Sequence, residues 1–428
     1  MKKKIKIAMI IIIIIEFALG MKLFAKEIPK EEIQGITAKN ILLAETDTNK
    51  ILYEKDIDKK IYPASITKLL TAILVVENCE LDEIVTVSEN AVNSVPSGYV
   101  NANLQVGEEL TVNDLLNVML IPSANDAANA LAEYVGGSIE SFSTMMNTRA
   151  KELGCTGSNF TNPSGLHQEE HYTTSRDILY ISQEAISNKI IKNIIKKINY
   201  TLPKTNKYKD TSRVFINTNY IIRKEMKDHY YKYCIGGKTG YTGEAKNCVV
   251  AFYKKDGIQL TAIIMGENAS VKGKKFLDAN KLAKYIYKNY EEKNIVYANE
   301  KYETVTIPNA TRETKKLNVN YENDIRILES KDINIENIEK HVEYKKISAP
   351  IIKGEILGTI KYTYDGIEYE TNLIAQSDVE ESKMLNKLLY IMISILIIYI
   401  IYNYKKIKRK KKSKNKNYYR QRAKTIYK

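Results

Sequence analysis

The sequence is poor in the residues that build disulfide scaffolds and metal sites. Its 428 residues include no tryptophan, four cysteines and four histidines. The cysteines form no C-x-x-C pair, and four cysteines in so long a chain do not make a disulfide scaffold. His167 and His171 are four residues apart, but they lie beside Pro163 and Gly165, which favours a loop over a metal-binding helix face. We therefore expect buried free thiols, no metal site and no cofactor.

The distribution of charge argues against a nucleic-acid partner. The net charge is +14, but residues 405–428 alone hold thirteen Lys and Arg and no acid. Residues 1–20 add +3, so the body between the two ends carries −2. Both basic clusters border apolar runs. We interpret them as signals of membrane topology and expect no nucleic-acid partner.

The first 25 residues have the pattern of a secretory signal peptide. A lysine-rich start precedes the apolar run at 7–15, and candidate cleavage sites that end in a small residue follow at 18–20 and 23–25. Glu16 is unusual inside such a segment, so an uncleaved anchor stays open. We expect a signal peptide at 1–25 and export of the body.

A second apolar run lies near the other end of the chain. Residues 388–404 carry no charge and would form about 25 Å of helix, and an extension back to Met384 brings the run close to a ~30 Å hydrocarbon core. The sequence thus predicts a transmembrane helix at 384–404. By the positive-inside rule, the basic tail at 405–428 is cytoplasmic and the body is extracellular.

The body alternates between strand and helix patterns. Residues 40–45 and 50–54 flank a turn and predict a β-hairpin, and three more strands are expected at 233–235, 247–253 and 260–265. Helical spacing is found at 110–120, 127–135, 142–153, 177–186 and 275–290. These patterns predict an α+β fold, an antiparallel sheet flanked by helices with an all-helical insert. From residue 295 onward, short alternating segments predict a small β-rich domain.

Ser65 and Lys68 stand at the start of a predicted apolar helix. Residues three apart share one helix face, so the two side chains can touch. A serine hydroxyl becomes a nucleophile when a base takes its proton, and a lysine with a lowered pKa can be that base. The pattern alone is weak, because Ser413 and Lys416 in the basic tail have the same spacing. Taken alone, Ser65 is more simply a helix cap and Lys68 a solvated charge.

Two further polar motifs follow. Ser123 and Asn125 lie at a break between predicted helices, where the simple interpretation is a local turn. Residues 236–243 hold four glycines around Lys238 and Thr239. So many glycines weaken a strand unless another backbone must approach closely, as a substrate lying antiparallel on a sheet edge would.

The three motifs Ser65-x-x-Lys68, Ser123-x-Asn125 and Lys238-Thr239-Gly240 occur in the order found in penicillin-binding proteins and class A β-lactamases. Over nearly all of residues 36–376 the chain resembles the D-alanyl-D-alanine carboxypeptidases, which are low-molecular-mass penicillin-binding proteins. The resemblance includes residues 62–72, 110–137, 162–166, 217–219 and 237–242. Residues 347–375 resemble the C-terminal β domain of the family.

The resemblance implies a role for each catalytic motif residue. Ser65 would be the nucleophile that is acylated by the penultimate D-alanine of a peptidoglycan pentapeptide. Lys68 would be its base, and Ser123 would relay a proton to the leaving D-alanine. Asn125 would hold the substrate backbone.

The resemblance also places the substrate-binding residues. Lys238 and Thr239 would bind the terminal carboxylate, and Lys238 would help to keep Lys68 neutral. Gly240 and Tyr241 would contact the substrate, and the backbone N–H groups of Ser65 and Tyr241 would form the oxyanion hole. Many relatives carry an arginine near Gly273 that also binds the carboxylate, whereas this chain has Lys274 and Lys275 there.

Together these features predict a carboxypeptidase domain at 26–292, a β-rich domain at 295–378, and an anchor that holds both at the cell-wall side of the membrane. The expected partners are peptidoglycan stem peptides, β-lactam inhibitors and the membrane. A β-lactamase and a non-catalytic scaffold remain as alternatives. A β-lactamase needs a carboxylate that activates water, and Glu169 and Glu170 lie in the loop after Gly165 without the expected spacing to an asparagine.

Overall fold

The computed structural model describes residues 34–426 except 269, 337 and 383, so the predicted signal peptide at 1–25 lies outside the described residues. The chain divides into two compact units. The first comprises Met1–Lys293 and Leu328–Asn334, and the second comprises Asn294–Ile327 and Ile335–Lys428.

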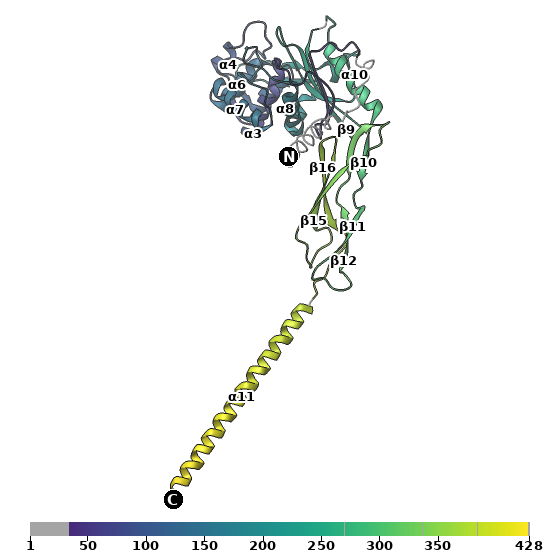
Figure 1. Ribbon diagram of the computed structural model, residues 1–428. Coiled ribbons are helices and arrows are strands. Elements are labelled where there is room, and N and C mark those ends of the chain that lie inside the picture. The colour runs from purple at the N-terminus through teal and green to yellow at the C-terminus, as the bar shows by residue number, and fades with distance from the viewer. Residues whose placement is uncertain (1–33, 269, 337, 383, 427–428) are drawn as a thin grey trace, which may run out of the picture. The chain divides into compact units, whose positions relative to one another are not determined.

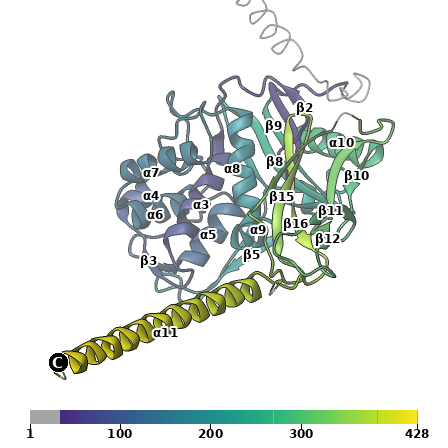
Figure 2. The ribbon, with the colours of Figure 1, turned by 60° about the horizontal axis from the view of Figure 1, so that its bottom comes forward.

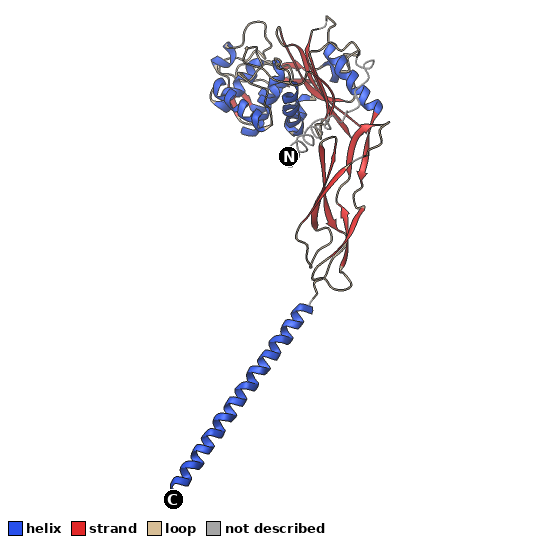
Figure 3. Cartoon of the chain, viewed as in Figure 1, coloured by secondary structure: helices blue, strands red, loops and turns tan. Residues whose placement is uncertain are grey.

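A five-stranded antiparallel sheet forms the centre of the first unit, with the order β2-β1-β9-β8-β7 (Figures 1 and 3). Its strands are β1 (Asn40–Glu45), β2 (Ile51–Lys55), β7 (Cys234–Thr242), β8 (Lys246–Lys255) and β9 (Ile258–Glu267). The predicted hairpin and the three predicted later strands all belong to this sheet. Strand β7 is an edge strand, so one side of its backbone is free to pair with a ligand.

The sheet is buried on both faces, and the strands alternate between two hydrophobic cores. In β1, Leu42 packs into the core on the helical side while Leu43 packs into the core beneath α10 (Lys274–Asn289). Strand β8 repeats this pattern with Val250 and Val249. Successive side chains of a strand point to opposite faces, which explains why these segments are almost continuously apolar in sequence.

Helices gather on the face of the sheet opposite α10 (Figure 2). They are α3 (Lys68–Asn78), α4 (Glu89–Asn93), α5 (Val112–Leu120), α6 (Asn125–Gly136), α7 (Ile139–Glu152), α8 (Ser175–Ser187) and α9 (Lys189–Ile195). The helix α3 is buried along most of its length. The predicted mixed fold with a helical insert is confirmed.

The start of α3 differs in detail from the expected helix cap. Residues Ala64–Thr67 form a short 3-10 turn, η1, directly ahead of α3. Ala64 has a left-handed backbone with φ of 47°. The tight turn projects Ser65 from the end of the buried helix, one turn before Lys68.

The glycine-rich motif lies inside β7, not after a short strand as expected. A Cβ on Gly240 would come within 3.1 Å of the Ser65 nitrogen, and a Cβ on Gly237 would meet the Val250 oxygen at 2.3 Å. Because backbone approaches so closely on both sides, glycine fits this strand where a side chain would not.

The structure also has short strands that the sequence patterns did not predict. They are β3 (Ile84–Thr86), β4 (Glu109–Thr111), β5 (Asn199–Leu202) and β6 (Arg213–Ile216), and a short turn, η2 (Tyr220–Ile222), precedes β7. Strands β5 and β6 pair with each other and have only 4 residues each, so their apolar pattern is too short to identify a strand from the sequence.

The second unit has a β sheet of its own with the order β11-β12-β16-β15-β14. The strands of this region are β10 (Tyr290–Val296), β11 (Lys301–Thr306), β12 (Lys316–Tyr321), β13 (Ile325–Ser330), β14 (Glu339–Tyr344), β15 (Ile356–Tyr364) and β16 (Ile367–Ala375). A separate core that includes Leu317, Ile360 and Leu373 holds the sheet together. The predicted β-rich C-terminal region is therefore present.

A single long helix, α11 (Met384–Ile426), ends the described chain. Its segment Lys387–Asn417 is long and apolar enough to cross a membrane, and its apolar side chains are not covered by protein. This C-terminal helix can serve as a membrane anchor.

Substitution of Gly165 tests how the loop at 162–165 packs on η1. It has φ of +80°, and a Cβ there would lie 1.9 Å from the Ala64 oxygen. Gly137 has a similar φ of +77° with nothing within 4 Å. We expect Gly137→Ala to lower the free energy of unfolding by about 1–2 kcal/mol, the usual cost of a left-handed alanine. Gly165→Ala should cost at least about 2 kcal/mol more, because the clash adds to that strain. Urea denaturation measures both, and equal losses would contradict this packing.

Candidate active site

Ser65 and Lys68 form the centre of the site. The Lys68 Nζ lies 2.9 Å from the Ser65 Oγ, and the lysine side chain is fully buried. The turn η1 and the first residue of α3 set this distance, as the three-residue spacing predicts.

Two carbonyl oxygens complete the surroundings of the Lys68 amine. Its Nζ donates to Asn125 Oδ1 at 2.7 Å and to the Ser164 backbone oxygen at 2.6 Å. A carbonyl oxygen can only accept, so these two bonds use both N–H groups of a neutral amine. In that neutral form the remaining lone pair faces the Ser65 hydroxyl and can accept a hydrogen bond from it. The arrangement fits an uncharged lysine ready to act as a base.

The second lysine of the site lies opposite the first. Lys238 is buried, and its Nζ donates to Ser123 Oγ at 2.7 Å and to the Thr239 backbone oxygen at 2.9 Å. Ser123 lies in the break between α5 and α6 and has φ of 76°, a left-handed conformation that is uncommon for serine. Such strained residues collect at functional sites, and this one places the hydroxyl beside Lys238.

Burial lowers the pKa values of three lysines of the site, and the charge of a neighbouring lysine adds to this effect for Lys68 and Lys238. Burial holds the pKa of Lys68 well below its usual range, and the charge of Lys238 lowers it further, while Asp126 opposes both effects. Burial, with help from Lys275, lowers the pKa of Lys238 to about 7. Burial lowers the pKa of Lys275 to about 8. No carboxylate within salt-bridge distance of these lysines is found among the described residues, so the ammonium forms are poorly compensated.

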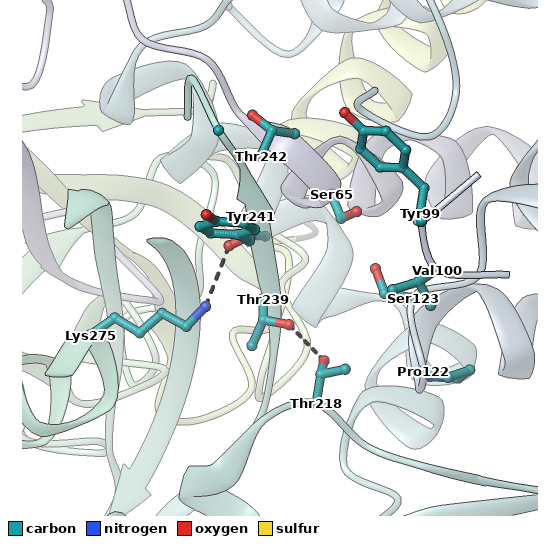
Figure 4. Close-up of a pocket in the computed structure, with 13 residues that line it drawn as sticks. Ser65, Tyr99, Val100, Pro122, Ser123, Thr218, Thr239, Tyr241, Thr242 and Lys275 are labelled. Atoms are coloured by element: carbon teal, nitrogen blue, oxygen red, sulfur yellow. Dashed lines mark hydrogen bonds between the residues drawn. The ribbon is translucent and has the colours of Figure 1, made fainter. Parts of the chain in front are cut away.

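A cavity of about 360 Å³ opens over Ser65 and Ser123 (Figure 4). Residues 239–243 of β7 and the following turn line one side, and Tyr99 and Val100 line the other. The Tyr241 side chain is 63% exposed at the mouth. The free edge of β7 therefore faces a hollow large enough for the end of a peptide.

Hydroxyl and ammonium groups surround one part of this cavity. Thr218 Oγ1 lies 2.6 Å from Thr239 Oγ1, and Lys275 Nζ donates to the Gly240 oxygen at 3.4 Å (Figure 4). Lys274 pairs instead with Asp278 at 2.7 Å. Of the two lysines after Gly273, it is therefore Lys275 that lines the cavity.

The structure brings together all the motif residues singled out from the sequence. They are Ser65, Lys68, Ser123, Asn125, Lys238, Thr239, Gly240 and Tyr241. Glu169 and Glu170 are exposed and do not line the cavity that contains Ser65. Neither one is placed to activate water for a β-lactamase reaction.

Asp126, Ser164 and Thr218 were not assigned a role from the sequence. The Asp126 carboxylate accepts from the backbone N–H groups of Ala102, at 2.9 and 3.0 Å, and Leu104, at 3.1 Å, which fixes the loop that carries Tyr99 and Val100. Ser164 acts through its carbonyl oxygen, for which a sequence carries no signal. Asp126 directly follows Asn125 of the Ser123-x-Asn125 motif, and this position is the only sign in the sequence that it belongs to the site.

The fold and the site together define a serine enzyme of the penicillin-binding class. A family model described as D-alanyl-D-alanine carboxypeptidase matches residues 26–269, and one described as penicillin-binding protein 5, C-terminal domain, matches residues 290–381. The chain belongs to the D-alanyl-D-alanine carboxypeptidase family.

Individual relatives agree with this assignment. The D-alanyl-D-alanine carboxypeptidase DacF of Bacillus subtilis is 32% identical over 91% of this chain and 97% of its own length. DacA of Haemophilus influenzae is 26% identical over 82% of this chain and 88% of its own. The crystal structure of penicillin-binding protein 5 from Haemophilus influenzae covers 81% of this chain and 98% of its own, with 25% identity and a TM-score of 0.63. The predicted family, fold class and enzyme class, a serine-type D-Ala-D-Ala carboxypeptidase that binds penicillin, are confirmed. A β-lactamase and a non-catalytic scaffold are not favoured.

The lowered pKa of Lys238 predicts a pH-dependent cost to folding. Below about pH 7 the folded and unfolded states both carry the proton, and the full penalty of a buried ammonium is present. The penalty falls as pH rises and vanishes near pH 10.5, where the lysine is neutral in both states. The stability of Lys238→Met relative to wild type should therefore be highest near pH 7 and decline by up to about 5 kcal/mol toward pH 10.5.

Denaturant titrations at several pH values measure this difference. Lys227→Met, which removes an exposed lysine, is the matched control and should show no such decline. A pH-independent difference for Lys238→Met would contradict the lowered pKa.

Proposed function

We propose that Ser65 removes the terminal D-alanine from peptidoglycan pentapeptides by way of an acyl-enzyme. The Ser65 oxygen attacks the carbonyl carbon of the penultimate D-alanine while its proton passes to the Lys68 amine. The observation that carries this proposal is the 2.9 Å contact between a fully buried lysine and the serine hydroxyl. A desolvated amine activates a hydroxyl at neutral pH, whereas an ammonium could not accept its proton.

Ser123 delivers a proton to the leaving group in this proposal. When the C–N bond breaks, the amine of the departing D-alanine needs a proton, and the Ser123 hydroxyl supplies one and receives in its place the proton that Lys68 took from Ser65, so that Lys68 is neutral again. The Lys238 ammonium, 2.7 Å from Ser123 Oγ, orients that hydroxyl and keeps its own proton. Water then attacks the acyl-enzyme, with Lys68 again taking the proton. Asn125, which also accepts from Lys68, holds the substrate backbone.

The terminal carboxylate of the substrate is bound by Lys238 and Thr239, with Thr218 and Lys275 beside them. The supporting observations are the contact between the two threonine hydroxyls and the position of Lys275 in the cavity lining. A bound carboxylate stabilises the ammonium form of Lys238, whose pKa is about 7 in the free site. The charged Lys238 in turn keeps Lys68 neutral, so substrate binding favours the reactive form of the base.

The oxyanion of the tetrahedral intermediate is stabilised by the backbone N–H groups of Ser65 and Tyr241. A pair of such donors typically lowers a barrier by several kcal/mol. The substrate lies antiparallel along the free edge of β7, which the glycines of residues 236–240 leave accessible. β-Lactams acylate Ser65 in the same way and act as inhibitors.

We also propose that the enzyme works at the cell-wall side of a membrane. A signal peptide at 1–25 exports the chain, the carboxypeptidase domain at 26–292 and the β-rich domain at 295–378 follow, and the helix at 384–404 anchors both. The thirteen Lys and Arg of residues 405–428 support a cytoplasmic tail.

Acylation of Ser65 can be tested by mass. After exposure to penicillin, the intact protein should gain one penicilloyl group that maps to Ser65. Ser65→Ala should lose the adduct and lower the rate of D-alanine release by at least about 10³-fold. Ser413→Ala is the matched control, because Ser413 has the same spacing to Lys416 in the tail. An adduct that persists in Ser65→Ala would refute the assignment.

The proposed membrane anchor and its orientation can be tested separately from the chemistry at Ser65. A chain that ends at Ser382 should be released from membranes without detergent and keep its rate of D-alanine release. Protease added to intact cells should degrade the body of the full-length protein and leave an epitope tag on residue 428 protected. Degradation of the tag with the body intact would reverse the proposed orientation.

A further inference from the structure

One side of the active-site cavity is formed by an irregular segment of the chain. Residues 98–104 form neither helix nor strand, and we call them the cavity wall. Tyr99 and Val100 of this wall line the cavity, and their side chains are 38% and 49% exposed. Tyr99 lies on the other side of Ser65 from Tyr241 of β7 (Figure 4). Because the wall has no regular structure, its position depends on contacts with neighbouring elements.

The helix α6 supplies the first set of contacts. The Asn125 backbone N–H donates to the Val100 oxygen at 2.9 Å. The Asp126 carboxylate accepts from the backbone N–H groups of Ala102 and Leu104, as described above. These bonds join the cavity wall to the helix that also presents Asn125 to Lys68.

Arg213, the first residue of β6, supplies the second set. Its Nη1 donates to the backbone oxygens of Ala102 and Asn103 at 3.1 Å each, and its Nη2 donates to the Glu108 carboxylate. The Glu108 side chain is fully buried, and that of Arg213 is 12% exposed. A guanidinium donates in fixed directions from one plane, so Arg213 sets the positions of the two carbonyl groups relative to Glu108.

The loop that precedes β6 supports Arg213. The Tyr208 ring lies 4.0 Å from the guanidinium carbon of Arg213, and its hydroxyl donates to the Asn103 oxygen at 2.7 Å. The Thr205 hydroxyl donates to the Glu108 carboxylate at 2.8 Å. We call Arg213, Tyr208, Thr205 and Glu108 the outer clamp. Two of its members bond directly to backbone oxygens of the cavity wall.

We propose that Arg213 is a positioning residue for substrate binding. By holding the carbonyls of Ala102 and Asn103, it keeps Tyr99 and Val100 in contact with a peptide that lies along β7. Arg213 itself is not part of the cavity lining, so it acts through the wall and touches neither the substrate nor the reacting atoms. The inference rests on the proposed function, because the peptide it concerns is the substrate of Ser65.

The first test measures KM and kcat for D-alanine release from a pentapeptide by the full-length protein in detergent. Penicillin labelling counts the folded sites. Arg213→Met should raise KM at least about fivefold and leave kcat per labelled site within about twofold, because the lost contact is made equally in the bound and transition states. Arg213→Lys, which keeps the charge without the planar fork, should raise KM by less. Arg176→Met is the matched control, since it removes an arginine that pairs with the exposed Asp58, and it should leave KM unchanged.

A second pair of variants separates positioning from stability. Arg213→Met leaves the buried Glu108 carboxylate without its cation, so it should also lower Tm. Adding Glu108→Gln removes that charge and should restore much of the lost Tm. KM should stay high in the double variant, because the carbonyls of Ala102 and Asn103 still lack their donor. A KM that recovers together with Tm would assign Arg213 to stability alone and overturn the inference.

A double-mutant cycle tests whether the outer clamp acts through Tyr99. Tyr99→Ala should raise KM by a factor similar to that of Arg213→Met. The combined variant should raise KM by clearly less than the product of the two factors, because both changes remove the same contact. Tyr134→Ala removes a tyrosine that is 42% exposed outside the cavity lining, and it should have no effect. Rises that multiply in the combined variant would overturn the inference.

The reaction with penicillin distinguishes failure of this inference from failure of the proposed function. A wild-type protein that releases no D-alanine would overturn the proposed function. The second-order rate constant of penicillin acylation then tests the outer clamp. It should fall several-fold in Arg213→Met and Tyr99→Ala and keep its wild-type value in Arg176→Met and Tyr134→Ala. Wild-type rate constants in all four variants would overturn the inference.

Discussion

The structure depends on keeping one buried amine uncharged. Lys68 has no accessible surface, and two carbonyl oxygens accept from it, so the lone pair of its neutral form is left for the Ser65 hydroxyl. A carboxylate at hydrogen-bond distance would instead stabilise the ammonium form and remove the base. Asp126 is the nearby acid that opposes the lowered pKa, and it is directed away, toward the backbone N–H groups of the loop before α5. Neighbouring lysines also help to keep the amines neutral. The charge of Lys238 makes protonation of Lys68 less favourable, and the charge of Lys275 does the same to Lys238.

The fold supplies this environment by joining elements that are far apart in sequence. The buried helix α3 carries Lys68, the break between α5 and α6 carries Ser123, and the edge strand β7 carries Lys238. The loop at 162–165 adds the Ser164 carbonyl, and Thr71 holds that loop by donating to the Pro163 oxygen at 2.6 Å. Left-handed residues at Ala64 and Ser123 show that the backbone is strained on both sides of the site. The surrounding cores stabilise the fold enough to tolerate that strain.

Much of this organisation can be predicted from the sequence, because burial leaves a periodic signal. The helices α3, α5, α6, α7, α8 and α10 and the strands β8 and β9 follow from apolar spacing, and the ordered motifs identify the site and the family. Strand β7 was harder to predict, since glycines that allow close backbone approach also remove the strand signal. Lys274 and Lys275 could not be distinguished from the sequence, because neighbouring residues of a helix point about 100° apart and only the packing of α10 shows which one lines the cavity. The role of the Ser164 carbonyl cannot be predicted from the residue type, because every residue carries the same backbone carbonyl group whatever its side chain.

The charge of Lys68 is therefore the quantity on which the account depends most. Nuclear magnetic resonance of the lysine side chains, with ¹⁵N at Nζ and Lys68→Met to assign the signal, reports that charge directly. The account predicts a neutral amine for Lys68 at pH 7 in the free enzyme, and protonation of it only in more acidic solution. An ammonium signal for Lys68 that persists to pH 9 would contradict the account, because the group assigned as the base would then hold its proton throughout the physiological range.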